Sequence, residues 1–212
     1  MVGTDTEVAI SPPGRRAIQV AETRAKLTAA GAQVFAASGF HAASMADVAG
    51  AAGLSQGAAY NHFAGKDAVF AAAFEADEPF AGLIEAISRE GAVGSDVTFE
   101  ERLLRAVQNL AQGPGRGWFD LLLIDMVEFD GRHWRALYQR HRSGFARAAG
   151  RIEASGRLTT VGGAAALRAL IAAALGQTLV ARLLAAGEDG VSKQEQTGSA
   201  ISLILKGALA AD

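Results

Sequence analysis

The 212-residue chain contains no cysteine, which excludes disulfide bonds and cysteine-ligated zinc or iron–sulfur sites. Aromatic residues are sparse, at 7% of the total, and the net charge at pH 7 is only −2. No basic segment followed by an apolar core opens the chain, so we predict no signal peptide. With 50% hydrophobic and 20% charged residues, the composition is that of an ordinary globular protein.

Long uninterrupted apolar runs are also missing. The longest, from Ala164 to Val180, contains Arg168 and Gln177 and is followed by Arg182. We expect no membrane span from a run broken in this way. A chain of this length can bury a sizeable core as one domain or as two small ones. We therefore expect a soluble, cytoplasmic protein with no membrane partner.

No segment shows the polar–apolar alternation of a half-buried strand, so the predicted fold class is all-α. Pro79 lies inside a helical pattern and should either kink that helix or begin a separate one. Capping boxes are predicted where Ser44 precedes Asp47 and where Thr98 precedes Glu101. About nine helices are expected, at approximately 17–38, 45–52, 55–63, 66–91, 98–112, 118–129, 132–154 and 162–186, with a last one after Ser192.

The stretch from Ser44 to Lys66 has the pattern of a helix-turn-helix. Gly53 stands where the first short helix must stop, because glycine tolerates the left-handed conformation of such an end. Ser55 can then cap the second helix, and two short helices joined by a glycine-containing turn form this motif. The same spacing also fits any helical hairpin in an all-α protein, so it does not by itself establish DNA binding.

The residue types at the second helix suit contact with a DNA duplex. Gln56 can pair with adenine, and the Ala58 methyl group can contact a thymine methyl. The side chains of Tyr60, His62 and Lys66 could reach phosphates, which fix register rather than sequence. The predicted DNA-binding residues are Ser44, Ser55, Gln56, Gly57, Ala58, Tyr60, Asn61, His62 and Lys66.

The charge balance of this region is only weakly basic. Residues 1–66 carry five Lys or Arg against four Asp or Glu. Nucleic-acid-binding domains usually have a strongly basic face. We therefore expect few phosphate contacts per chain, which a dimer would double.

Several residues occur at the fixed spacing of a known family. They are Ala30, Phe35, Gly39, Phe40, Ser44, Asp47, Val48, Ala49, Ala52, Gly53, Leu54, Ser55, Gly57, Tyr60, Phe63, Lys66 and Val69. From about Thr23 to Phe70 the chain thereby resembles the N-terminal domain of the tetracycline-repressor (TetR-type) family of bacterial transcription regulators. The rest of the chain matches that family only in its helical layout.

The resemblance implies a ligand-responsive regulator, most often a repressor, that binds a double-stranded DNA operator as a homodimer. We expect a near-palindromic operator, a small-molecule effector and no cofactor. The expected organisation is a disordered arm at 1–14, a helix-turn-helix domain at 15–66, and a ligand-binding and dimerisation domain at 67–212.

Two adjacent helices of the expected body carry many of the chain's aromatic residues close to a few polar ones. A largely apolar cavity with a few convergent polar groups is typical of small-molecule sites, although most of these residues could simply fill a core. We predict a mainly hydrophobic effector bound by Trp118, Phe119, Asp125, Phe129, Trp134, Tyr138, His141 and Gln177.

The last two predicted helices have longer apolar stripes than one small body needs. Their many alanine and glycine residues would let helices approach closely, so we expect both to pair with their two-fold mates. The predicted dimer interface comprises Leu167, Ile171, Leu175, Leu179, Ile201, Ile204 and Leu205.

Two other functional classes remain as alternatives. A helical partner-binding protein would account for the body but not for the pattern from Ser44 to Lys66. An enzyme would need catalytic groups, yet the four histidines show no metal-ligand spacing and no nucleophile elbow occurs. Asp125 and Glu128 on one helix, with His141 opposite, could imitate an acid–base site, but nothing else supports catalysis. We therefore predict no enzymatic activity and no metal site.

Overall fold

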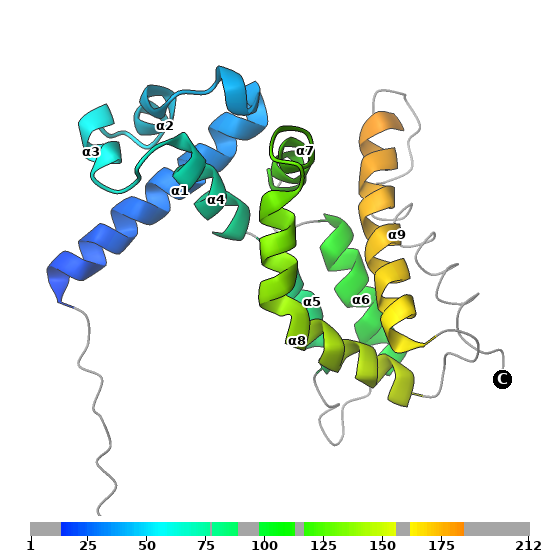
Figure 1. Ribbon diagram of the computed structural model, residues 1–212. Helices are drawn as coiled ribbons and strands as arrows, with labels where there is room; N and C mark the ends of the chain where they lie inside the picture. The colour runs from blue at the N-terminus through cyan, green and yellow to red at the C-terminus, as the bar shows by residue number, and fades with distance from the viewer. Residues whose placement is uncertain (1–13, 77, 89–97, 113–116, 156–161, 185–212) are drawn as a thin grey trace, which may run out of the picture. The chain divides into compact units, whose positions relative to one another are not determined.

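The computed structural model describes residues 14–76, 78–88, 98–112, 117–155 and 162–184. All regular structure in these ranges is helical, which confirms the predicted all-α class (Figure 1). Residues 1–13 of the arm predicted at 1–14, and the helix predicted after Ser192, lie outside the described residues. The helices are α1 (Arg15–Ala42), α2 (Met45–Ala51), α3 (Gln56–Tyr60), α4 (Lys66–Ala76), α5 (Phe80–Ser88), α6 (Phe99–Gln112), α7 (Trp118–Glu128), α8 (Arg132–Ala154) and α9 (Gly163–Leu184).

Glycine and proline set two of the boundaries that the sequence left uncertain. α1 reaches beyond its predicted end but is interrupted at Gly39, whose φ of 76° is a left-handed value that favours glycine. Pro79 lies between α4 and α5, so it precedes a separate helix rather than kinking a long one. Both amides at the start of α5, those of Phe80 and Ala81, donate to the carboxylate of Glu78.

The chain divides into two compact units, Met1–Ala73 and Phe74–Asp212, and the boundary falls inside α4. In the first unit α1 packs against α2, and α2 packs against α3. Three phenylalanine rings join α1 to α4, because the ring of Phe70 lies 5.5 Å from that of Phe35 and 5.6 Å from that of Phe40. The unit also buries Leu27, Met45, Val48, Ala49, Ala59, Phe63 and Val69.

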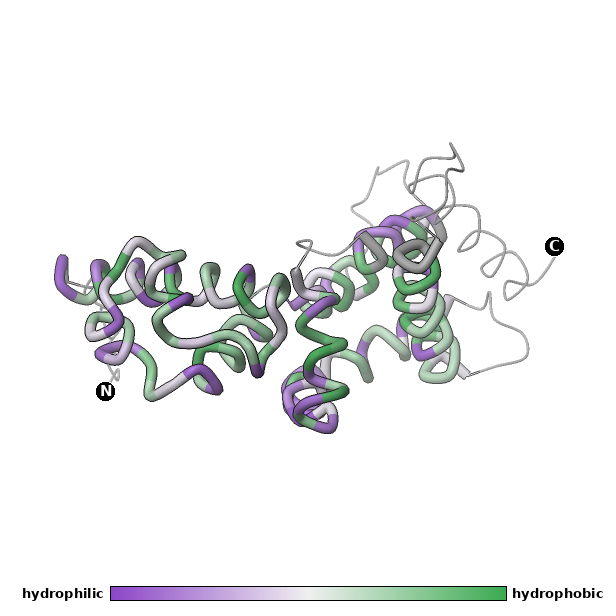
Figure 2. The backbone as a smooth tube through the Cα atoms, turned by 90° about the horizontal axis from the view of Figure 1, so that it is seen from above, coloured by the Kyte–Doolittle hydropathy of each residue, from purple (hydrophilic) through white to green (hydrophobic). Residues whose placement is uncertain are grey.

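The second unit is built around a ring of four helices. α5 packs against α8, α8 against α9, α9 against α6, and α6 against α5. α5 and α8 approach closely at Gly144, where an added Cβ would lie 2.9 Å from the side chain of Ile84. α7 packs on α8 alongside this bundle. In Figure 2 hydrophobic and hydrophilic residues alternate around the helical turns, as amphipathic helices require.

α9 is the one described helix that is long and apolar enough to cross a membrane. Its window Gly163–Val180 has a mean hydropathy of 1.5, and 28% of it is buried. Core helices of soluble proteins meet the same criteria of length and composition. α9 indeed packs against α6 and α8 through Ala166, Leu167, Leu170 and Ala174, which are buried. Its length and composition therefore do not establish a membrane location.

Candidate nucleic-acid interface and aromatic cluster

The first helix of the predicted motif begins with the expected capping box. The amide of Asp47 donates to the Ser44 hydroxyl oxygen at 3.2 Å, and the amide of Ser44 donates to the Asp47 carboxylate at 2.9 Å. The Ser44 hydroxyl also donates to that carboxylate at 2.6 Å. These donors lower the pKa of Asp47 below its ordinary value. The stability that Asp47 adds is therefore present above its ordinary pKa and lost as the pH falls through the lowered value.

The turn and the second helix also follow from local sequence. Gly53 has a φ of 69°, as the predicted helix end requires. Ser55 caps α3 by accepting a hydrogen bond from the amide of Ala58 at 3.2 Å. α3 is shorter than predicted, since it ends at Tyr60 rather than near Phe63.

Most of the predicted DNA-binding side chains lie on the surface of the first unit. Tyr60 is 50% exposed, and its hydroxyl makes no hydrogen bond within the described part of the chain. Gln56 and Gly57 stand exposed at the start of α3, where a recognition helix presents its base-contacting residues. Of the others, Ser44, Ser55 and Asn61 are exposed, whereas Ala58 and His62 are half-buried.

Lys66 has a structural role that the sequence analysis did not foresee. Its Nζ donates to the carbonyls of Phe40, Ala43 and His41 at 2.9, 3.2 and 3.3 Å, and it lies 4.5 Å from the centre of the Phe40 ring. An ammonium group has three donors, and each is directed at one of these carbonyls. Lys66 therefore caps the C-terminal end of α1. In this conformation its ammonium group is not free to reach a phosphate.

Arg24 is a residue of the first unit that sequence reasoning missed. Its guanidinium donates to the carbonyl of His62 at 2.6 Å and lies 4.0 Å from the centre of the Phe63 ring. These contacts tie the segment after α3 to the middle of α1. The two ends of the hydrogen bond are 38 residues apart, and no local pattern marks such a pair.

Four of the predicted effector residues come together in the second unit. The ring of Phe80 lies 5.9 Å from that of Trp118, 5.2 Å from that of Trp134 and 5.4 Å from that of Phe145. Tyr138 stacks on Phe145 at 5.3 Å, and the ring of His141 lies 6.3 Å from Phe145. We call Phe80, Trp118, Trp134, Tyr138 and Phe145 the aromatic cluster. Phe80 and Phe145 were not among the predicted effector residues.

The other predicted effector residues are placed differently. Phe129 packs against the ring of His133 at 4.9 Å, and Phe119 is buried on α7. Gln177 is half-buried on α9. No hydrogen bond or ring contact joins Gln177 to the aromatic cluster within the described residues.

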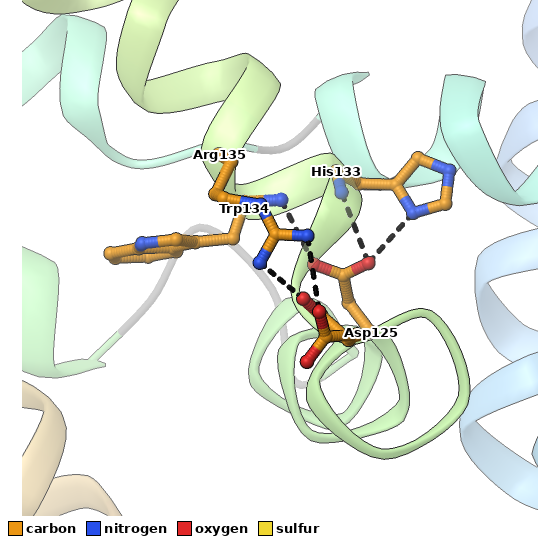
Figure 3. Close-up of polar contacts among 5 residues, drawn as sticks. Asp125, His133, Trp134 and Arg135 are labelled. Carbon is orange, nitrogen blue, oxygen red and sulfur yellow. Dashed lines mark hydrogen bonds and ion pairs between the residues drawn. The ribbon is translucent and has the colours of Figure 1, made fainter.

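Asp125 is fully buried, and its carboxylate accepts hydrogen bonds from the first turn of α8 (Figure 3). One carboxylate oxygen accepts from the His133 amide at 3.1 Å and contacts the His133 ring at 2.7 Å. The other accepts from the Trp134 amide at 2.9 Å. A carboxylate at a helix N-terminus satisfies amides that have no partner in the helix and complements the helix dipole. Asp125 therefore caps the N-terminus of α8. Because both of its carboxylate oxygens are used there, it is poorly placed to orient an effector.

His141 is also engaged by its neighbours. It lies 2.9 Å from the carboxylate of Glu78, which itself caps α5. The acid–base grouping of Asp125, Glu128 and His141 is therefore not assembled, because Asp125 contacts His133 whereas His141 contacts Glu78.

The predicted interface residues on α9 differ in their accessibility. Leu167 is buried in the single chain, so it packs inside the body and is not available to a partner. Ile171 and Leu175 are half-buried, while Leu179 and Val180 are exposed. Ile201, Ile204 and Leu205 lie outside the described residues.

The role of Lys66 predicts the effect of removing its charge. Lys66→Met should lower the free energy of unfolding by about 1–3 kcal/mol, because the carbonyls at the end of α1 lose a charged donor. Lys26→Met is the matched control, since Lys26 is exposed on α1 without a partner among the described residues, and it should change stability by less than about 0.5 kcal/mol. Urea denaturation measures both. Equal midpoints for Lys66→Met and the wild type would contradict the structural role.

The role of Asp125 makes a second prediction. Asp125→Asn keeps the shape of the side chain but replaces an acceptor oxygen with a donor amide, so one α8 contact is lost. The free energy of unfolding should fall by about 2–3 kcal/mol, the scale for a buried hydrogen bond to a charged group. Asp130→Asn, in the exposed turn between α7 and α8, should have little effect on the same thermal unfolding curve. If both variants shift the melting temperature by a similarly small amount, Asp125 does not stabilise α8.

We compared the chain with known protein families, with curated sequences and with solved structures. Residues 27–73 match the sequence model described as "Bacterial regulatory proteins, tetR family". No curated protein sequence matches the chain. Many solved structures share its fold at low sequence identity, and three are described here. A TetR-family transcriptional regulator from Pectobacterium atrosepticum is 22% identical, with a TM-score of 0.62 over 94% of this chain and 99% of that one.

The other two structures match slightly smaller shares of the chains. GusR from Salmonella enterica is 22% identical, with a TM-score of 0.64 over 89% of this chain and 95% of that one. SmeT, in its complex with triclosan, is 21% identical, with a TM-score of 0.64 over 89% and 92%. The predicted resemblance is thereby confirmed: residues 27–73 match the model of the tetR family of bacterial regulatory proteins, and the chain shares its helical fold with a TetR-family transcriptional regulator.

Proposed function

We propose that the chain is a ligand-responsive DNA-binding transcription regulator, a repressor that a small hydrophobic effector releases from its operator. The observation that carries this proposal is the exposed start of α3 inside the family's N-terminal domain. α3 is capped by Ser55 and presents Gln56, Gly57 and Tyr60 to solvent. A short helix after a tight turn, with its N-terminal residues exposed, suits insertion into a major groove.

Each side chain would have a distinct role on the duplex. The amide group of Gln56 can bond an adenine edge in two places, which reads sequence. The exposed hydroxyl of Tyr60 can donate to a phosphate, which sets register. Residues 1–66 are nearly neutral, and Lys66 is engaged by carbonyls. One chain would therefore make few phosphate contacts, and useful affinity requires two.

A second copy of the chain is the expected partner on the DNA. α9 buries one side against α6 and α8, while its outer side carries exposed Leu179 and Val180 beside half-buried Ile171 and Leu175. An apolar helix face of this kind suits a two-fold interface, to which the predicted last helix would add. Two-fold symmetry in the protein requires a near-palindromic operator.

The aromatic cluster is the proposed effector site. Apolar rings that pack edge to face provide a hydrophobic environment, and the partly exposed Tyr138 offers a hydroxyl to orient a ligand. SmeT, a protein of the same fold, binds triclosan in its solved complex, which favours a small hydrophobic molecule here too. Such a molecule can act as a switch only if it binds the DNA-incompetent state more tightly.

The alternatives explain less of the structure. A helical protein that binds only other proteins would not need an exposed, capped α3 in this motif. An enzyme would need assembled catalytic groups, and no three His, Asp or Glu side chains gather as a metal site within the described ranges. We therefore propose a regulator without a cofactor or catalytic activity, acting in the cytoplasm where operator DNA lies.

The DNA-binding role predicts the outcome of a selection from random duplexes. The purified chain should enrich a near-palindrome, bind it as two chains per duplex, and lose affinity steeply as salt increases. Gln56→Ala should relax specificity at one or two positions, with a loss of about 1–3 kcal/mol on the selected sequence. Gln33→Ala, an exposed glutamine of α1, is the matched control and should leave specificity unchanged. Failure to enrich any duplex at low salt would refute the regulator proposal.

The effector role predicts linked changes in stability and DNA affinity. In a thermal-shift screen of small apolar compounds, those that raise the melting temperature should also weaken operator binding. A 100-fold loss of operator affinity needs about 2.7 kcal/mol of coupling, within the usual allosteric range. Trp134→Ala should enlarge the site and change which compounds score. Hits that stabilise the protein but leave operator affinity untouched would show that the cluster is not the switch.

A further inference from the structure

Trp118 belongs to the aromatic cluster and also makes a polar contact outside it. Its indole Nε1–H donates to the backbone carbonyl of Phe74 at 3.0 Å, and both residues are buried. The Trp118 ring also lies 5.5 Å from the ring of Phe74. One side chain therefore touches both the proposed effector site and the end of α4.

Phe74 occupies a particular place in the chain. It lies in the last turn of α4, where helix carbonyls need partners outside the helix. It is also the first residue of the second unit, because the boundary between the units follows Ala73. The Trp118 hydrogen bond thus binds the residue that directly follows the first unit.

Other contacts hold the same short segment, but most are weaker. Arg140 pairs with Glu75 at 2.7 Å, with both side chains about half exposed, and such surface pairs contribute little. His141 pairs with Glu78 at 2.9 Å. The bond from Trp118 to Phe74 is the buried one that also involves the aromatic cluster, so it is sensitive to what the cluster contains.

The packing around Trp118 leaves it little freedom to move alone. Its ring lies 5.9 Å from that of Phe80 and 6.4 Å from that of Trp134. A molecule that enters between these rings must displace one of them, because protein interiors are close-packed. The Nε1 atom is part of the rigid indole, so a displacement of about 1 Å would carry the 3.0 Å bond beyond hydrogen-bonding distance.

We propose that Trp118 is a positioning residue that links the aromatic cluster to the end of α4. Its bond to Phe74 is formed in the DNA-binding state and is broken when an apolar molecule displaces the indole. The inference rests on the proposed function and assigns its coupling to one hydrogen bond. A purely structural role would instead keep the bond in both states.

Trp134 provides a matched control within the same cluster. It is the only other tryptophan of the chain. Its ring packs on Phe80 at 5.2 Å, yet its indole N–H donates to no residue in the part of the chain that the structure describes. Replacing either tryptophan with phenylalanine removes an indole from the cluster, but only Trp118→Phe also removes the hydrogen bond.

The experiment measures operator affinity without any effector, on the duplex selected by the wild type. Trp118→Phe should bind that duplex about tenfold more weakly, within the range that one lost buried hydrogen bond allows. Trp134→Phe should weaken binding less than Trp118→Phe does, because it loses no bond to the protein, and equal losses for the two variants would contradict the proposal. If Trp118→Phe melts at a lower temperature but binds the operator as the wild type does, the bond is structural and the coupling is refuted.

A second measurement uses the wild-type chain and needs no stable variant. Two tryptophans give two indole N–H signals in a ¹⁵N-labelled sample, and either variant assigns them. Adding the operator duplex should slow the hydrogen exchange of the Trp118 indole and leave that of Trp134 unchanged. Equal exchange of the Trp118 indole in free and bound protein would overturn the inference. A wild type that binds no duplex would instead refute the proposed function itself, and this inference with it.

Discussion

Every helix ends with backbone groups that have no partner inside it, and side chains are one means of satisfying them. Here those side chains come from two sources. Some lie beside the helix end, as Ser44 does at α2 and Glu78 at α5. Others reach from distant helices, as Lys66 does to the end of α1 and Trp118 to the end of α4. Each of these distant contacts joins two helices. The same hydrogen bond therefore satisfies a helix end and stabilises the packing of one helix against another.

This constraint explains how a helix as short as α3 can be stable. α3 spans only Gln56–Tyr60, and an isolated helix of that length would not persist in water. Ser55 caps its start, Ala59 buries its inner side, and Arg24 anchors the segment that follows it. The outer side is then free for contact with another molecule. These contacts stabilise α3 although the helix is too short to be stable alone. None of them uses the side chains on its exposed side.

The sequence predicted what depends on neighbours in the chain. The capping boxes at Ser44 and Thr98, the turn at Gly53 and the helical class all follow from spacing along the chain, and the structure confirms them. Contacts between residues that lie far apart in the chain were not predicted. Lys66 looked like a phosphate ligand and Asp125 like an effector ligand, because charge and periodicity do not show which carbonyl or amide a side chain will meet. Leu167 had the periodicity of an interface residue, yet only packing shows that it is buried within the single chain.

The central claim is that two copies of α3 read one duplex on the same face. Hydroxyl-radical footprinting of the chain on its selected operator tests that claim most directly, because it maps the protected backbone without any assumption about residues. We predict two protected patches related by a dyad and separated by about one helical turn, roughly 34–36 Å, or a multiple of it. A single patch, or uniform weak protection along the duplex, would contradict the account.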